Sequence, residues 1–104
     1  MKIRFVRSAE PELLEIRDWY ENRKPGLGGE FLQEVSSCLE AVEIDPVRFP
    51  AEETNVSSRD IRRSRLKKFP YRVIYELTPN DLRVLAIAHG SRQPGYWSER
   101  LEED

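Results

Sequence analysis

The sequence predicts an α+β fold, in which a helical hairpin packs on one face of a small, mostly antiparallel sheet. Two segments with helical spacing of apolar residues, 9–23 and 31–42, lie on either side of a glycine-rich break. Two alternating segments, 71–77 and 82–88, flank a short turn and are typical of a strand hairpin. With one strand before the helices and another before the hairpin, the element order is βααβββ. At 104 residues the chain fits one domain, 1–104.

The first half of the chain supplies one strand and both helices. Residues 2–7 alternate apolar and charged side chains, which predicts a strand, and Ser8 offers a cap for the helix that follows. Pro11 is tolerated because it lies in the first turn of that helix. The second helix ends before the Asp45-Pro46 dipeptide. Apolar positions at helical spacing are Ala9, Leu13, Ile16 and Tyr20 in the first helix, and Phe31, Val35, Cys38, Leu39 and Val42 in the second.

The second half of the chain supplies the other three strands. Residues 47–58 contain a proline and no clear periodicity, so we expect an irregular connection there. The arginine-rich segment 61–69 precedes the hairpin, whose turn is Thr78-Pro79-Asn80-Asp81. Proline presets the second position of such a turn, and Asn and Asp tolerate the remaining geometry.

The turn also sets the expected register of the hairpin. If Leu77 faces Leu82, Arg72 faces Ile87, and Arg72 and His89 then project from the same side of the sheet. The other side collects apolar residues that suit a helical cover: Leu66, Val73, Tyr75, Leu77, Leu82, Val84, Ala86 and Ala88.

The arginine-rich strand is expected to extend the side that carries Arg72. A tight link through Phe69-Pro70 places Lys67 opposite Arg72 and Arg65 opposite Ile74, and Arg63 follows on the same side. A bulge in this strand would shift every assignment before it.

Charge is segregated along the chain, although its formal net value is only −2. Residues 59–72 carry seven basic side chains and a single acidic one, Asp60. This pattern suits a surface that binds nucleic-acid phosphates or an acidic partner peptide. The alternative is a solvated strand edge whose charges prevent aggregation.

The composition excludes several classes of protein. One cysteine and one histidine cannot build a disulfide framework or a Cys/His metal site, and we expect no metal or cofactor. No segment has the apolar length of a signal peptide or of a membrane span, so we expect a cytoplasmic protein.

The segment 89–97, His-Gly-Ser-Arg-Gln-Pro-Gly-Tyr-Trp, contains the chain's most chemically versatile side chains. Arginine neutralises charge that develops during phosphoryl transfer, histidine exchanges protons near neutral pH, and aromatic rings stack on bases. These groups are those that a metal-independent ribonuclease needs. Equally, His89 could cap a sheet edge and Tyr96 and Trp97 could anchor the tail. The acidic residues of the first helix are interpreted as a solvated face: Glu10, Glu12, Glu15, Asp18 and Glu21.

Taken together, several motifs resemble those of the RelE/ParE superfamily, toxins of bacterial type II toxin-antitoxin modules that are often labelled plasmid stabilization proteins. The resemblance covers nearly the whole chain and implies the same helical hairpin on an antiparallel sheet. The motifs are Ala9-Glu10-Pro11-Glu12-Leu13-Leu14, Trp19-Tyr20, Pro25-Gly26-Leu27-Gly28, Asp45-Pro46 to Phe49-Pro50, Tyr71-Arg72-Val73-Ile74-Tyr75-Glu76, and the AHGSRQPGYW tail.

The resemblance implies a toxin that a cognate antitoxin protein neutralises, and it offers two targets. RelE-like members are mRNA interferases that cut messenger RNA in the ribosomal A site, whereas ParE-like members bind DNA gyrase and are not enzymes. A degenerate, non-toxic binding module is a third alternative. The RelE-like interpretation assigns catalysis to Arg72, His89, Arg92 and Tyr96, and target binding to Arg63, Arg65 and Lys67. Since arginine scarcely deprotonates, His89 or Tyr96 would be the general base.

Overall fold

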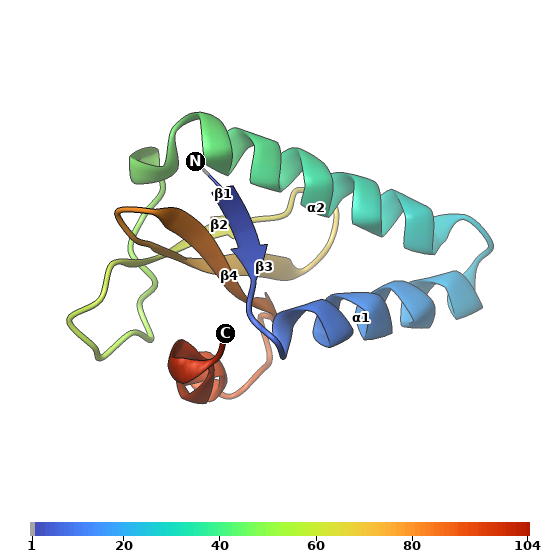
Figure 1. The fold of residues 1–104 in the computed structure, drawn as a ribbon. Coiled ribbons are helices and arrows are strands. Elements are labelled where there is room, and N and C mark those ends of the chain that lie inside the picture. The colour runs from blue at the N-terminus through green and yellow to red at the C-terminus, as the bar shows by residue number, and fades with distance from the viewer. Residues whose placement is uncertain (1) are drawn as a thin grey trace.

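In a computed structural model, which describes residues 2–104, the two helices pack together along one face of a four-stranded sheet (Figure 1). The observed order is βααβββ, as the sequence predicts, with a short 3₁₀ helix after the second helix and another at the carboxyl end. The elements are β1 Lys2–Phe5, α1 Ala9–Arg23, α2 Leu27–Ile44, η1 Pro46–Arg48, β2 Ile61–Arg65, β3 Tyr71–Leu77, β4 Asp81–His89 and η2 Tyr96–Glu102. No helix within residues 2–104 has the length and hydropathy needed to cross a membrane.

The strands lie in the order β1-β4-β3-β2, so the first and last strands of the chain are neighbours at one side of the sheet. β1 runs parallel to β4, and the other two pairings are antiparallel. β1 is much shorter than β4 and pairs with it only from Asp81 to Val84. The second half of β4 therefore has a strand on one side only.

The β3–β4 hairpin begins in the expected register and then departs from it. Leu77 pairs with Leu82 as predicted, but the register shifts between Ile74 and Tyr75, and Leu85 has no partner residue on β3. This is a β-bulge, in which one extra residue of β4 is accommodated. The sequence at this point contains neither glycine nor any other signal for a bulge.

The bulge reverses the faces of every β4 residue that follows it, because successive side chains of a strand point to opposite sides. Arg72 pairs with Ala88 instead of Ile87, and Tyr71 pairs with His89. The expectation that Arg72 and His89 share a face is therefore wrong: His89 lies on the helix-covered face, and Arg72 lies on the other. Ala86 and Ala88, expected beneath the helices, lie on the face of Arg72.

The arginine-rich strand also pairs two residues away from its expected position. Arg65, not Lys67, lies opposite Arg72, and Arg63 lies opposite Ile74. The link is not a tight two-residue turn, since the Leu66 amide donates to the Tyr71 carbonyl and four residues lie between them. A shift of two residues preserves the face, so Arg63 and Arg65 still share a side with Arg72.

The helical hairpin is held by backbone proximity at its turn and by aromatic packing beneath it. The Glu21 carboxylate accepts the amides of Gly26 and Gly28 at the start of α2, at 2.9 and 3.0 Å. A Cβ on Gly28 would lie 2.7 Å from the Arg17 carbonyl oxygen, so this position requires glycine for the close approach of the two helices. Four aromatic side chains join the helices to the sheet, namely Tyr20, Phe31, Phe69 and Tyr71.

The face opposite the helices is covered by the connection 49–60 and by η2. Trp97 is buried there, and its indole Nε1 lies 3.3 Å from the Thr54 hydroxyl. The alternative that this residue anchors the tail is thus the one observed. On the helix-covered face, the Tyr75 hydroxyl donates to the Pro46 carbonyl. Burial raises the pKa of Tyr75 to about 12.

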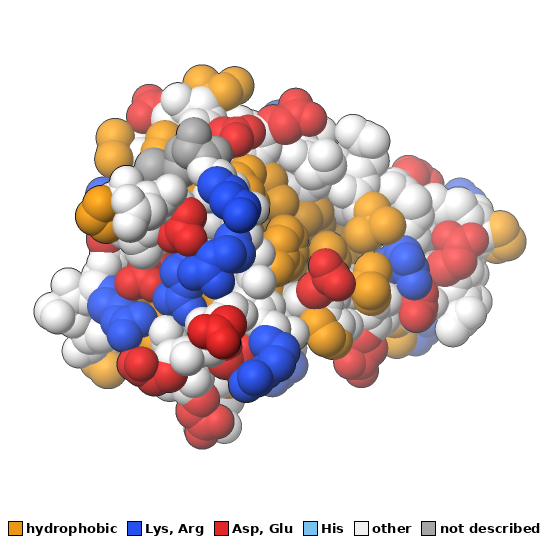
Figure 2. Space-filling view, in the orientation of Figure 1, with side chains coloured by type: hydrophobic (Ala, Val, Ile, Leu, Met, Phe, Trp, Pro, Cys, Tyr) orange, Lys and Arg blue, Asp and Glu red, His pale blue; other side chains and the backbone are white. Residues whose placement is uncertain are grey.

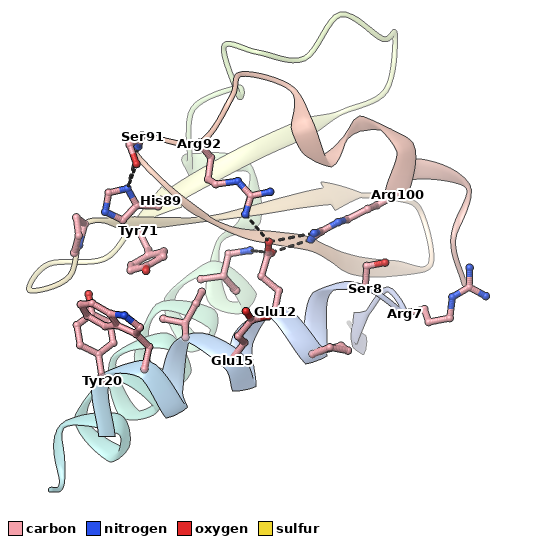
Figure 3. Close-up of a pocket in the computed structure, with 15 residues that line it drawn as sticks. Arg7, Ser8, Glu12, Glu15, Tyr20, Tyr71, His89, Ser91, Arg92 and Arg100 are labelled. Atoms are coloured by element: carbon pink, nitrogen blue, oxygen red, sulfur yellow. Dashed lines mark hydrogen bonds and ion pairs between the residues drawn. The ribbon is translucent and has the colours of Figure 1, made fainter. Parts of the chain in front are cut away.

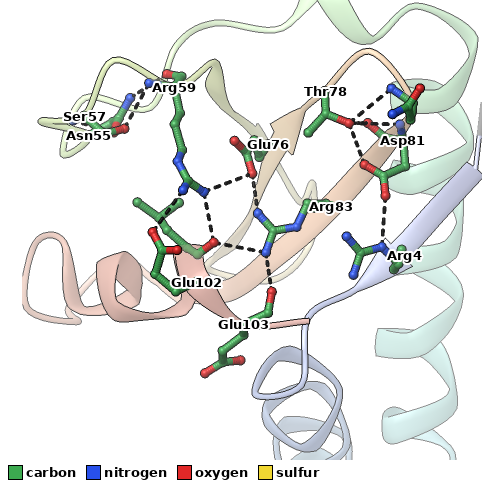
Figure 4. Close-up of polar contacts among 12 residues, drawn as sticks. Arg4, Asn55, Ser57, Arg59, Glu76, Thr78, Asp81, Arg83, Glu102 and Glu103 are labelled. Atoms are coloured by element: carbon green, nitrogen blue, oxygen red, sulfur yellow. Dashed lines mark hydrogen bonds and ion pairs between the residues drawn. The ribbon is translucent and has the colours of Figure 1, made fainter.

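The carboxyl end is fastened to the sheet and to the start of α1 (Figure 4). Arg83 pairs with Glu76 and donates to the backbone carbonyls of Leu101 and Glu103. The Glu103 carboxylate in turn accepts the Ser8 amide and hydroxyl at 2.7 and 2.6 Å. Ser8 therefore precedes α1 as expected, but its hydroxyl binds Glu103 and does not cap the helix. These hydrogen bonds lower the pKa of Glu103.

Candidate functional site

A cleft of about 1020 Å³ opens between α1, the second half of β4 and the segment that follows it (Figure 3). Its apolar floor comes from α1 and β3 and includes the half-exposed Trp19. Its polar wall comes from Glu12 of α1, the end of β4 and the tail. The polar residues that line the wall are Glu12, His89, Ser91, Arg92 and Arg100.

Glu12 is the point at which the elements of the cleft meet. Its carboxylate accepts the Ile87 amide at 2.9 Å and the Tyr96 hydroxyl at 2.8 Å. Arg100 donates to both of its oxygens, at 2.8 and 3.1 Å, and an Arg92 nitrogen lies 4.0 Å away (Figure 3). The side chain is only 11% exposed. An ion pair so enclosed depends on the hydrogen bonds that satisfy it.

Sequence interpretation missed Glu12, which was assigned to a solvated helix face together with Glu10 and Glu15. A signal was present, because Glu12 stands three residues after Ala9 and four before Ile16, on the apolar stripe itself. A carboxylate on such a stripe needs a buried partner. Its partner, Arg100, lies 88 residues further along the chain and has no recognisable motif around it.

His89 lies at the mouth of the cleft with its ring edge against Tyr71, at 5.0 Å between centroids. The Ser91 amide donates to its Nδ1 at 3.0 Å, and the Ser91 hydroxyl lies 2.8 Å from the same nitrogen. Because the amide can only donate, Nδ1 is the acceptor of this hydrogen bond, and its lone pair is engaged within the chain.

Tyr96 stands behind the polar wall and is held as a hydrogen-bond donor. Burial, followed by the Glu12 charge and the hydrogen bond to Glu12, raises the pKa of the Tyr96 hydroxyl well above its ordinary value. The Arg92 guanidinium lies 3.8 Å from the centre of the Tyr96 ring, and the Arg100 guanidinium lies 5.2 Å from it on a second cation-π contact. Arg92 is 53% exposed and so presents its charge to the cleft.

Arg72 lies on the far face of the sheet, outside the cleft. Its guanidinium makes two parallel hydrogen bonds to the Glu52 carboxylate, at 2.9 and 3.1 Å, and the Glu52 side chain is 2% exposed. Burial by itself would raise the pKa of Glu52, but hydrogen bonds from Arg72 and Thr54 outweigh burial and lower it. Of the four residues expected to act together, the structure brings His89, Arg92 and Tyr96 near one cleft and separates Arg72 from them.

The residues expected to bind a target are also differently engaged. Arg63 pairs with Glu53 at 3.1 Å and donates to the Ala51 carbonyl. Arg65 and Lys67 are exposed and line a second groove of about 590 Å³ between α2 and β2. In Figure 2 most of the visible Lys and Arg side chains gather with Asp and Glu side chains over β1 and the carboxyl end, beside a band of apolar side chains. Several of the charges in the arginine-rich segment are thus neutralised within the chain.

Neither groove supplies the ligands of a metal site. Among residues 2–104, no three His, Cys, Asp or Glu side chains are grouped so as to hold a metal ion. Cys38 is half-buried and lies 3.2 Å from the Ser64 hydroxyl, and burial raises the pKa of its thiol.

Comparison with known proteins identifies the family. A family model described as the ParE toxin of type II toxin-antitoxin system, parDE, matches residues 3–94. The chain belongs to the ParE toxin family. A solved structure described as the chromosomal ParDE TA system from P. aeruginosa has a TM-score of 0.71, covering 86% of this chain and 95% of that one, at 17% identity. At this identity the likeness shows the fold of the ParE toxin family, and no curated protein matches the chain.

Proposed function

We propose that the protein is the toxin of a parDE-type pair and that it arrests growth by binding its target without cutting RNA. The observation that carries this proposal is the separation of the residues that cleavage would need. Arg72 lies on one face of the sheet, bound to Glu52, while His89 and Arg92 line a cleft on the other side. A single phosphodiester cannot lie within hydrogen-bond reach of groups on both faces.

The two residues that the sequence offers as general bases, His89 and Tyr96, are also engaged in hydrogen bonds within the chain. Such a group must accept a proton, which requires a free lone pair near the reacting hydroxyl. Tyr96 donates to Glu12 and has a raised pKa, so its hydroxyl stays protonated. The Nδ1 lone pair of His89 is taken by the Ser91 amide. Both candidate bases are therefore occupied.

DNA gyrase is the proposed target and a cognate antitoxin the proposed partner. Both follow from the family, whose ParE-like members bind gyrase. The charge of the protein favours the same choice, because its sequence pI is about 5.5 and much of the arginine-rich segment is already paired with acidic side chains. A protein that enters an RNA-lined ribosomal site gains affinity from unpaired positive charge. The exposed Arg92 and the apolar floor of the cleft suit a protein surface.

The test combines controlled expression with two assays of the purified protein. We expect growth arrest on expression, relief by the cognate antitoxin, inhibition of gyrase supercoiling, and no new messenger RNA ends by primer extension in a translating extract. Arg92→Ala should weaken arrest and gyrase inhibition while the fold remains intact, because the side chain is exposed. Arg17→Ala is the matched control, since it also removes one exposed guanidinium, whose ion pair with Asp18 is on the surface.

Each other outcome has a defined meaning. Cuts within codons at stalled ribosomes, absent with Arg92→Ala, would contradict the proposal and favour a RelE-like ribonuclease. Expression that leaves growth unchanged in cells without the antitoxin would instead identify a non-toxic binding module of the same fold.

A further inference from the structure

One edge of β4 is paired with β1 along only half of its length. β1 ends at Phe5, and its last contact with β4 is the hydrogen bond from the Val6 amide to the Val84 carbonyl, at 3.0 Å. Beyond this bond, no strand within residues 2–104 pairs with the segment from Leu85 to His89 on that side. A bare edge exposes backbone donors and acceptors that need partners or attract another chain.

Side chains take the place of the missing strand. The Glu12 carboxylate accepts the Ile87 amide, and Arg100 donates to the Leu85 carbonyl at 3.0 Å. The Tyr96 hydroxyl lies 3.5 Å from the Ile87 carbonyl while it donates to Glu12. These three side chains come from α1 and η2, so the edge of β4 joins the beginning and the end of the chain.

Glu12 is the member of this cluster that no other side chain can replace. Its Oε1 accepts from the Ile87 amide and Arg100, and its Oε2 accepts from Tyr96 and Arg100. Only an ionised carboxylate accepts at both ends, because an amide offers one oxygen and places N–H donors at the other position. An isosteric glutamine would therefore turn its N–H donors toward Arg100 in either orientation, and also toward either the Tyr96 hydroxyl or the Ile87 amide.

Glu12 also affects the position of Arg92, through Tyr96. Its guanidinium rests on the Tyr96 ring, and the hydroxyl of that ring is fixed by Glu12. We propose that Glu12 is the positioning residue of the cleft, whose carboxylate holds Tyr96 and Arg100 on the uncovered edge of β4 and so fixes where Arg92 stands. Its effect on toxicity rests on the proposed function, in which Arg92 contacts the target.

The first measurement is independent of toxicity. In Glu12→Gln, hydrogen exchange at the Ile87 amide should accelerate by roughly tenfold or more, because its hydrogen bond loses the carboxylate charge in one amide orientation and is lost entirely in the other. The ¹⁵N-¹H signal of the Arg92 Nε should also shift, because the Tyr96 ring that contacts its guanidinium moves. Glu10→Gln is the matched control: it removes the same charge from an exposed position of α1 outside the cleft, and it should change neither signal.

The second measurement separates positioning from stability. Val42→Ala shortens a buried side chain far from the cleft and serves as a control of reduced stability. When the two variants are compared at equal fractions folded, growth arrest by Glu12→Gln should fall at least fivefold further than growth arrest by Val42→Ala. A fivefold loss of affinity corresponds to about 1 kcal/mol of binding free energy.

Two results would overturn the proposal. In one, Glu12→Gln and Glu10→Gln give the same Ile87 exchange and the same Arg92 signal. In the other, those signals change but toxicity falls only as far as with Val42→Ala, which would leave Glu12 a structural residue. A wild-type protein without toxicity would refute the proposed function alone, and the exchange and Arg92 signals would still decide whether Glu12 positions the cleft.

Discussion

Replacing Arg72 with alanine isolates the ion pair on the far face of the sheet. In the wild type, Arg72 and Glu52 form two parallel hydrogen bonds, and the Glu52 side chain is 2% exposed. Alanine removes the guanidinium and leaves the carboxylate buried with only its two hydrogen bonds from Thr54. The variant therefore measures the cost of an unpaired buried charge.

The expected loss is large for a domain of this size. Removing one partner of a buried ion pair costs about 3 to 5 kcal/mol of unfolding free energy. Because Thr54 still donates two hydrogen bonds to the Glu52 carboxylate, we expect a loss of about 3 kcal/mol. Single domains are stable by roughly 5 to 15 kcal/mol. A domain at the lower end of this range would keep only about 2 kcal/mol of stability. Arg72→Ala is therefore unsuitable for testing toxicity with the fold left intact.

Urea unfolding followed by tryptophan fluorescence measures the effect, because Trp97 is buried beside Thr54 on the same face. With an m-value of about 1.5 kcal/mol/M, the midpoint should fall by about 2 M. Adding Glu52→Gln to Arg72→Ala should recover part of the loss, since an amide is cheaper to bury than a charge. A midpoint shift below about 0.5 M for Arg72→Ala, comparable with Arg17→Ala, would refute the reasoning.

The remaining predictions concern acid, the helical hairpin and the thiol. Because the pKa of Glu52 is lowered in the folded state, its ion pair stabilises the fold at pH values above the ordinary carboxyl pKa of 4.5. This contribution is lost as pH falls through the lower folded-state pKa. In urea titrations at acid pH, the difference in unfolding free energy between the wild type and Arg72→Ala should therefore become smaller. Gly28→Ala should cost roughly 1 to 3 kcal/mol in thermal unfolding, whereas Gly29→Ala, whose Cβ meets nothing within 4 Å, should be neutral or stabilising by up to about 1 kcal/mol. Equal effects at the two glycines would contradict the close helix approach. Cys38 should react slowly with a disulfide reagent at neutral pH and quickly in denaturant, because burial raises the pKa of its thiol, and rapid labelling of the native protein would argue against that burial.

The fold could be predicted because its signals are local. Helical spacing around Phe31 and Val35, alternation that only Ile74 interrupts from Tyr71 to Leu77, and a four-residue turn each act over a few residues. Their order along the chain leaves few ways to cover the apolar side of the sheet. The family then confirmed this architecture.

The candidate site was predicted less well because its assembly is not local. A bulge at Leu85 costs one residue of register, and it moves His89 to the face opposite Arg72. No glycine or other sequence signal near Leu85 indicates the bulge. The residues of the 89–97 tail were correctly singled out by their chemistry, and their roles remain predictions.

The sequence by itself determined which segments become helices and strands, because hydrophobic periodicity and turn chemistry are written into neighbouring residues. Tertiary structure alone decided which charges meet. Glu12 lies 88 residues from Arg100, and Glu52 lies 20 residues from Arg72. A buried charge is stable only where the folded chain brings donors to it. These pairings arise only in the folded chain, and no local sequence pattern encodes them.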